Sequence, residues 1–170
     1  MLKRFWERRR DDEGFTLIEL MVVVLIIGIL IAIALPTFLG ARTRAQNRAA
    51  QSDLRNALVA VKTMYTDTST YANADETGTG LVTVEPNLCY VAAGTASVSS
   101  GATCVNGSGS GSISVAPSTN VSWSAARMSA SGTCYYIKEI AASGVRYGQT
   151  ATAADCTGTL AAGAAATAWT

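Results

Sequence analysis

One carboxylate stands out because its surroundings make it chemically unusual. Glu19 is followed directly by residues 20–35, none of which has a polar side chain. An ionised carboxylate costs roughly 2.5–3.5 kcal/mol at the centre of a membrane-spanning helix, and less near an interface. Two interpretations therefore stay open. Glu19 reaches the lipid headgroups at the membrane edge, or it awaits a cation from another chain.

Groups that catalyse reactions are otherwise scarce in this sequence. The chain has no histidine, which excludes Ser-His and Cys-His nucleophile pairs and the usual zinc sites. It also has no Gly-x-x-x-x-Gly-Lys loop, so it is not a P-loop ATPase. No base accompanies the many serines of the second half. We therefore expect no catalytic residue, no cofactor and no bound metal.

The apolar run that contains Glu19 has the length of a membrane span. As a helix, residues 15–36 would cover roughly 30 Å, the thickness of a bilayer's hydrocarbon core. Residues 1–14 carry five Lys/Arg side chains, and basic residues beside a span place that end in the cytoplasm. An ordinary secretory signal is cut after its apolar region, and no clean site of that kind follows here. The sequence therefore predicts a membrane anchor whose remainder faces outward.

Cysteines occur only in the part predicted to lie outside the cytoplasm, where disulfides persist. They are Cys89, Cys104, Cys134 and Cys156, and no two form a Cys-x-x-Cys pair. Four cysteines allow three connectivities. We favour the sequential pairing, Cys89–Cys104 and Cys134–Cys156, because it closes short loops around adjacent strands. Each closed loop would stabilise the fold by roughly 3 kcal/mol.

The start of the apolar run resembles a known family. Residues 14–20 read Gly-Phe-Thr-Leu-Ile-Glu-Leu, and the apolar helix that follows contains Gly28 and Pro36. This string resembles the signature of type IV pilins and of their pseudopilin relatives. The resemblance covers residues 14 to about 65 and its motif is highly specific, whereas the heads of the family diverge widely.

The resemblance implies a pathway of processing and assembly. A membrane peptidase would cut between Gly14 and Phe15, remove the leader and methylate the new amine of Phe15. Glu19 would neutralise the terminal amine of a neighbouring subunit as a helical homo-oligomeric filament forms. The implied partners are the prepilin peptidase and methyltransferase, an inner-membrane assembly platform and a separate assembly ATPase. The protein would lie in the cytoplasmic membrane before assembly and in a cell-surface pilus afterwards.

The helix has two weak positions and is expected to continue beyond the membrane. Pro36 lacks a backbone N–H and its ring clashes with an earlier carbonyl, and Gly28 costs up to about 1 kcal/mol relative to alanine. We expect a mild kink in the single chain, and the resemblance implies a helix break between such positions in some assembled pili. Residues 40–65 would continue as an amphipathic helix. Its apolar positions are Ala50, Leu54, Ala57, Leu58, Val61 and Met64 or Tyr65.

Beyond the helix, residues 66–170 are predicted to form an extracytoplasmic head. Residues 66–86 would be a connecting loop and residues 105–112 a flexible hairpin loop. The tail from residue 157 would be ordered only where it touches the head. Strand patterns occur at residues 88–91, 113–115, 121–125, 134–140 and 145–149. The predicted fold class is α+β, a long N-terminal helix packed on a small antiparallel sheet of about four strands. The expected core residues are Val121, Trp123, Tyr135 and Ile137.

Charge is distributed unevenly between the two parts outside the membrane. Residues 40–65 carry five basic side chains and Asp53 as their only acid, whereas residues 66–170 carry three basic and six acidic side chains. This complementarity favours contacts between subunits, although a solvated helix face beside the membrane would show the same pattern. The formal net charge of +1 argues against a dedicated nucleic-acid binder.

The sequence thus predicts a prepilin with a leader at 1–14, a transmembrane assembly helix at 15–39, an amphipathic helix at 40–65 and a head at 66–170. It would form a type IV pilus that serves adhesion, twitching motility or DNA uptake. The alternatives are a type II secretion pseudopilin, whose major subunit commonly holds calcium in the head, and a membrane-tethered enzyme or binding protein. The head has no dense acidic cluster, which argues against the calcium site.

Overall fold

The computed structural model describes residues 14–77, 79–104, 107–109, 111–151, 155–164, 166 and 168–169. The predicted leader, apart from Gly14, and residues 105, 106 and 110 of the predicted hairpin loop lie outside the described residues. The chain forms two compact units, the first ending at Arg42 and the second beginning at Thr43.

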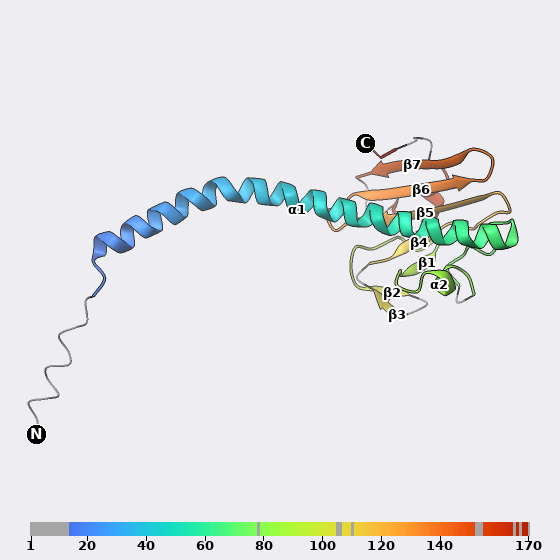
Figure 1. Ribbon diagram of the computed structural model, residues 1–170, viewed down its shortest axis with the longest axis horizontal. Helices are drawn as coiled ribbons and strands as arrows, with labels where there is room; N and C mark the ends of the chain where they lie inside the picture. Colours follow the sequence, from blue (N-terminus) through green and yellow to red (C-terminus); the bar gives the residue numbers. More distant parts are fainter. Residues whose placement is uncertain are drawn as a thin grey trace, which may run out of the picture. The chain divides into compact units, whose positions relative to one another are not determined.

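A single long helix, α1 (Leu17–Thr68), belongs to both units (Figure 1). Pro36 lies inside α1, and the helix also continues without interruption through Gly28. The hydrogen bond lost at Pro36 and the low helix propensity of Gly28 therefore do not end the helix in the single chain. A helix break at these positions in an assembled form stays a prediction.

Within the second unit, one face of α1 packs against the head. The spacing of its apolar residues predicted this face, and the prediction is confirmed. Met64 and Tyr65 are partly buried against the same cluster. The helix ends where Ser69 adopts a positive φ of 57°, and the Ser69 N–H donates to the carbonyl of Tyr65 at 2.7 Å. The buried residues of α1 are Ala50, Leu54, Ala57, Leu58, Ala60 and Val61.

The head is built on a mixed sheet of five strands in the order β1-β4-β5-β6-β7 (Figure 1). The strands are β1 (Tyr90–Ala92), β4 (Ile113–Val115), β5 (Ser122–Met128), β6 (Cys134–Ile140) and β7 (Gly144–Thr150). β4 to β7 pair antiparallel, but β1 pairs parallel with β4. The predicted α+β class, a long helix packed on a small sheet, is confirmed, but the sheet has five strands rather than about four and is mixed rather than antiparallel. Residues 93–112 form the long crossover connection that parallel pairing needs.

Short elements occupy the segments that the sequence predicted as loops. β2 (Ala102–Cys104) and β3 (Gly107–Gly109) form a separate antiparallel pair within the crossover. α2 (Leu81–Val84) lies in the predicted connecting loop, and α3 (Gly158–Ala161) lies in the tail. The tail also pairs with the sheet, because Ala166 forms an antiparallel bridge with Tyr147.

Apolar side chains between α1 and the sheet form the larger core. Trp123, Tyr135 and Ile137 are buried there, as predicted. Val121 is 60% exposed, so the prediction for this residue was wrong. It precedes the first residue of β5, in a turn where the Thr119 hydroxyl accepts the backbone N–H of Ser122.

A second, smaller core contains residues from β5 and β6 together with tail residues. It consists of Ala126, Met128, Cys134, Cys156 and Ala161. Gly158 allows α3 to approach β4, because a Cβ added there would lie 2.2 Å from the backbone nitrogen of Ala116. β5 is therefore buried along almost its whole length, which explains why its sequence does not alternate cleanly between apolar and polar residues.

Candidate functional site

The peptide bond between Gly14 and Phe15 lies just before α1 and is accessible. Gly14 is exposed, and a Cβ added to it would meet no atom within 4 Å. The Phe15 side chain is 89% exposed. This bond, which the sequence predicted as the cleavage site, is therefore open to a protease in the structure of the chain.

Thr16 and Glu19 together cap the first turn of α1. The backbone N–H and the hydroxyl of Thr16 donate to Oε2 of Glu19 at 2.8 and 2.6 Å. The backbone N–H of Glu19 lies 3.3 Å from the Thr16 hydroxyl oxygen and donates to it. This reciprocal pattern is a capping box. Within the described residues, Oε1 of Glu19 accepts no hydrogen bond, so one carboxylate oxygen is available to a further donor.

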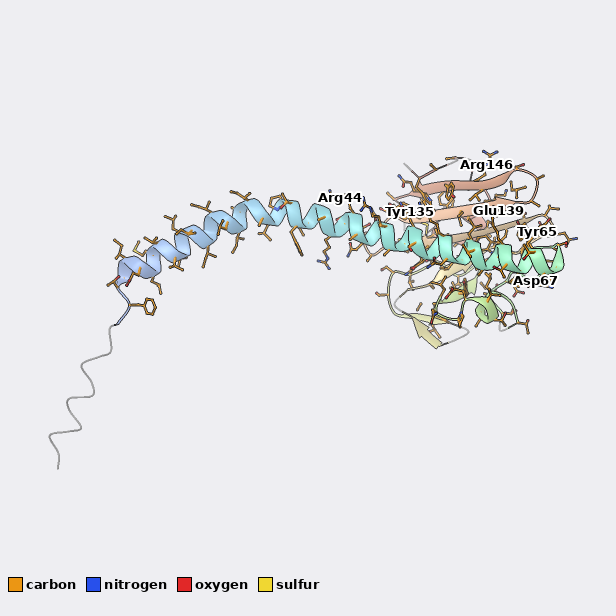
Figure 2. All side chains as sticks on the ribbon, in the orientation of Figure 1. Arg44, Tyr65, Asp67, Tyr135, Glu139 and Arg146 are labelled. Carbon is orange, nitrogen blue, oxygen red and sulfur yellow. A yellow bond between two sulfur atoms is a disulfide. The ribbon has the colours of Figure 1, made fainter. Side chains whose placement is uncertain are left out.

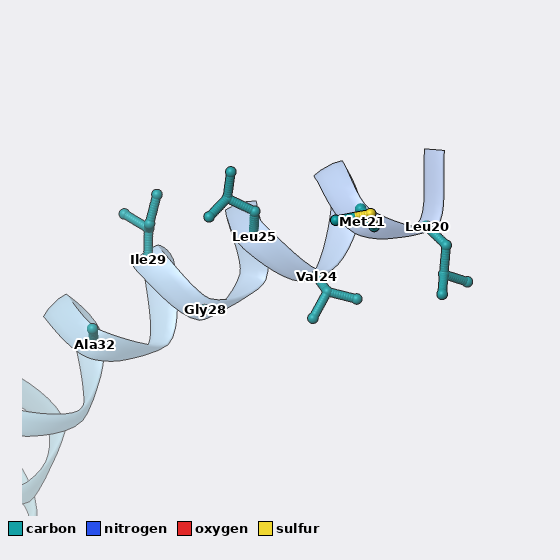
Figure 3. Close-up of a pocket in the computed structure, with 7 residues that line it drawn as sticks. All are labelled: Leu20, Met21, Val24, Leu25, Gly28, Ile29 and Ala32. Atoms are coloured by element: carbon teal, nitrogen blue, oxygen red, sulfur yellow. The ribbon is translucent and has the colours of Figure 1, made fainter. Parts of the chain in front are cut away.

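Length and composition make α1 a candidate membrane span, and its most apolar 18-residue window has a mean hydropathy of 3.1 with no residue buried. The helix surface is not uniform. Because Gly28 has no side chain, a shallow apolar groove of about 590 Å³ opens around it (Figure 3). Its other lining residues are Leu20, Met21, Val24, Leu25, Ile29 and Ala32.

Two ion pairs join the basic half of α1 to the head within one chain. Lys62 lies 3.5 Å from Oε1 of Glu139, and Figure 2 labels Glu139 on the sheet. Arg127 lies 3.1 Å from Oδ2 of Asp53. Arg127 is buried and also donates to the carbonyls of Val98 and Ser112. Part of the charge complementarity seen in the sequence is therefore used inside the chain, and its role between subunits stays a prediction.

Two buried tyrosines of the head have raised pKa values. Burial raises the pKa of Tyr71 to about 12, and the negative charge of Glu139 adds to the effect. The hydroxyl of Tyr71 donates to Oε1 of Glu139 at 3.4 Å. Burial also raises the pKa of Tyr90 well above its usual range, and its hydroxyl has no hydrogen-bond partner within the described residues. Both groups stay neutral in the folded protein at physiological pH.

The four cysteines form two disulfides, Cys89–Cys104 and Cys134–Cys156. This is the sequential pairing that the sequence favoured. The first connects the segment before β1 to the β2–β3 pair, and the second connects the start of β6 to the residue immediately before the tail. Within the described residues, no three His, Cys, Asp or Glu side chains gather into a group that could hold a metal ion.

The structure brings some predicted site residues together and leaves others apart. Gly14, Phe15 and Glu19 share the first turn of α1 and its approach, whereas the disulfides belong to the second unit. Sequence reasoning missed the capping box, although the spacing Thr16-x-x-Glu19 before an apolar run is its known signature. It also missed the burial of Arg127, for which the sequence carries no local signal, because its partner Asp53 is 74 residues away.

Comparison with known proteins adds to this geometry. Residues 9–35 match a family model described as the prokaryotic N-terminal methylation motif. The chain is 42% identical over 78 residues to the type IV major pilin protein PilA of Myxococcus xanthus, covering 45% of this chain and 34% of that protein. It is 39% identical over 84 residues to the type II secretion system core protein G of Vibrio cholerae, which cover 48% of this chain and 56% of that protein.

A third relative is the type IV wide pilus major component PilA4 of Thermus thermophilus, 38% identical over 64 residues, which cover 38% of this chain and 49% of that protein. The chain thus spans about a third to a little over half of the length of these relatives. No solved structure matches the chain significantly. The methylation motif and these relatives support a type IV pilin-like protein, and the exposed apolar helix and the α+β head are consistent with one.

Proposed function

We propose that this chain is a structural subunit of a type IV pilus. It is made as a prepilin, cut between Gly14 and Phe15, methylated at the Phe15 amine and polymerised through α1. One observation carries this proposal: the apolar first half of α1 is exposed, its first turn holds a carboxylate, and it follows directly on an accessible Gly-Phe bond. Relatives named as major pilins add support.

Glu19 supplies the charge that selects and positions the next subunit. Cleavage creates an amine on Phe15, about 6 Å along the axis from Glu19 of the same chain. Each charge alone is costly in lipid, and pairing offsets much of that cost. An axially offset neighbour can direct its Phe15 amine at Oε1 of Glu19, while Thr16 holds Oε2. Assembly then removes an unpaired intramembrane charge and sets the axial register.

Other proteins would carry out the steps that this chain does not perform. A prepilin peptidase and methyltransferase processes the first turn, and an inner-membrane platform with a separate ATPase drives assembly. The prepilin lies in the cytoplasmic membrane with its leader, residues 1–14, inside and the head outside. After the leader is removed, the subunit joins a surface filament that serves adhesion, motility or DNA uptake. With three basic residues in the head, a specific nucleic-acid partner is not expected.

The second candidate function is that of a type II secretion pseudopilin. Several relatives bear the name core protein G of that system, including one that is 36% identical over 87 residues. The two functions share processing and the role of Glu19 but differ in their product. Deleting the gene should remove long surface filaments if the chain is a pilin. Loss of protein secretion with unchanged surface filaments would instead assign it to secretion.

A charge-neutralising pair of variants tests the mechanism. Glu19→Gln keeps the shape of the side chain and removes its charge, whereas Glu76→Gln makes the same change in the head. We expect Glu19→Gln to be cleaved and to accumulate in the membrane, with few or no filaments in a quantitative shearing assay. Glu76→Gln should assemble normally. Intact-mass analysis should show wild-type subunits that begin at a methylated Phe15. Wild-type filament yield from Glu19→Gln would reject the pairing mechanism.

A further inference from the structure

The described part of the tail places the side chain of Trp169 in a cleft between α1 and β7. The indole Nε1 of Trp169 donates to the carbonyls of Tyr136 and Gly148 at 3.2 and 3.1 Å. Its ring centroid lies 4.5 Å from that of Tyr147, in an edge-to-face arrangement. The bridge between Ala166 and Tyr147 brings the tail to this edge of the sheet (Figure 1). The ring is thus held in place by the sheet.

Two cavities of about 310 and 210 Å³ adjoin this ring, and both are lined by Tyr147 and Trp169. The larger also includes Tyr136 and Gln149, and the smaller includes Gln51 and Arg55 of α1. The larger cavity lies at the lower end of the size range of small-molecule sites. Together they present three aromatic rings, two amides and one guanidinium, and no carboxylate among the described lining residues.

Arg55 is the charged residue among the described residues that line the two cavities. Its Cζ lies 5.1 Å from the centroid of the Trp169 ring, so the guanidinium is positioned over an aromatic face. Within the described residues, Arg55 forms no salt bridge, whereas Arg127 and Lys62 each have an acidic partner. Glu139, the acid on β6, is already paired with Lys62. A guanidinium placed at a cavity without a carboxylate of its own matches a carboxylate brought by a ligand.

We propose that the cleft between α1, β7 and the tail binds an acidic pyranose, a uronic acid unit of a polysaccharide. The flat C–H face of such a ring packs on aromatic side chains such as Tyr147, and its carboxylate pairs with Arg55. The amide of Gln51 can hydrogen-bond ring hydroxyls. This activity goes beyond filament formation and does not depend on it.

A single-stranded nucleic acid fits these observations less well. Such ligands need aromatic stacking together with several cations along the backbone path. Arg55 is the one cation among the described residues that line the two cavities. One guanidinium matches one carboxylate per binding site better than a run of phosphates.

The test uses the full chain, purified in a zwitterionic detergent that carries no sugar headgroup. Trigalacturonate and neutral galactotriose are titrated while ligand saturation-transfer NMR and tryptophan fluorescence are recorded. We expect binding of trigalacturonate at least about tenfold tighter than that of galactotriose, because only the acidic sugar can make a charge-assisted pair. Equal binding of the two sugars, or no binding of trigalacturonate up to 10 mM, would overturn the proposal.

Two arginine variants on the same helix locate the site. Arg55→Gln should weaken trigalacturonate binding about tenfold or more, whereas Arg48→Gln, an exposed position that lines neither cavity, should leave it unchanged. Near-UV circular dichroism checks that each variant keeps the native head. Equal losses in both variants would show general charge attraction and overturn the site. A short oligothymidine that binds more tightly than trigalacturonate and depends on Arg55 would overturn the sugar in favour of nucleic acid.

Discussion

The two halves of α1 share the same helical backbone conformation but lie in opposite environments. In the first unit, Leu25 is 63% exposed and every residue from 14 to 39 is open to its surroundings. In the second unit, Leu54 is fully buried against the sheet. The first half contains apolar residues on all sides, whereas the second half has one apolar face. A helix that is apolar all round needs lipid or another protein to cover it.

Under the proposed function, this difference separates folding from assembly along one helix. The second half stabilises the head, because its apolar face is buried by contacts within the chain. The first half leaves its apolar surface, its groove at Gly28 and its carboxylate at Glu19 exposed, and we propose that partners outside the chain cover them. Mutations in the two halves should therefore act on different measurements, and matched pairs of variants can test this separation.

Removing the same side chain from each half should give the largest contrast. Leu54→Ala leaves a cavity in the core and should destabilise the head by about 3 kcal/mol, within the 2–5 kcal/mol typical of such changes. Leu25→Ala should leave the stability of the head unchanged, because Leu25 is exposed. Chemical unfolding of the full chain in detergent, followed by near-UV circular dichroism, measures both. Similar losses from the two variants would contradict the separation.

The two disulfides should contribute unequally to the head. Replacing Cys134 and Cys156 together by alanine should cost about 3 kcal/mol of chain entropy, and both residues are also fully buried in the smaller core. Replacing Cys89 and Cys104 should cost less, because the second of these is only partly buried. The same unfolding experiment ranks the two double variants. A larger loss from the Cys89/Cys104 variant would show that the crossover, rather than the tail, limits stability.

Adding bulk to each half should produce smaller and opposite effects on stability. Gly28→Leu meets no atom within 4 Å of its Cβ and removes a glycine from a helix interior, so the single chain should fold at least as well. Ala60→Leu inserts atoms into a packed core and should cost about 1–3 kcal/mol. If the groove receives a neighbouring helix, Gly28→Leu should also lower filament yield. A stable head and normal filaments would exclude the groove from assembly.

Local patterns in the sequence predicted much of this structure. The apolar spacing on residues 50–65 predicted the buried face of α1, because that spacing has the period of a helix. β6 and β7 follow aromatic and β-branched runs, and the string at residues 14–20 marked the first turn of α1. The charge of Glu19 was also noted, although its place in a capping box with Thr16 was missed.

Features that depend on distant contacts could not be predicted in this way. The direction of β1 relative to β4 depends on the path of residues 93–112, and no local pattern encodes it. The burial of Arg127 depends on Asp53, and the order of the tail depends on Trp169 reaching Tyr136 and Gly148. The alternating pattern includes Val121, which lies one residue before β5 begins. The pattern alone therefore placed an exposed residue in the core.

At pH 7 the smallest effect concerns the hydroxyl of Tyr90, which belongs to the second unit and should influence only the stability of that unit. This hydroxyl is buried with no hydrogen-bond partner in the described part of the chain. Removing it in Tyr90→Phe should change stability at pH 7 by no more than about 1 kcal/mol, because no bond is lost. Burial, together with the charges of Glu85 and Asp53, raises the pKa of Tyr90 above the ordinary value of 10.0.

The sign of the pH dependence follows from this raised pKa. Above pH 10 the unfolded chain releases the Tyr90 proton while the folded chain retains it, so stability is complete below pH 10 and falls as pH rises. One such group contributes a slope of up to about 1.4 kcal/mol per pH unit. Tyr90→Phe should remove that part of the slope between pH 10 and 12, whereas Tyr136→Phe, which keeps both buried hydroxyls, should follow the wild-type profile. Unfolding measured across this range decides the point, and identical slopes for wild type and Tyr90→Phe would mean that water reaches this hydroxyl in the native head.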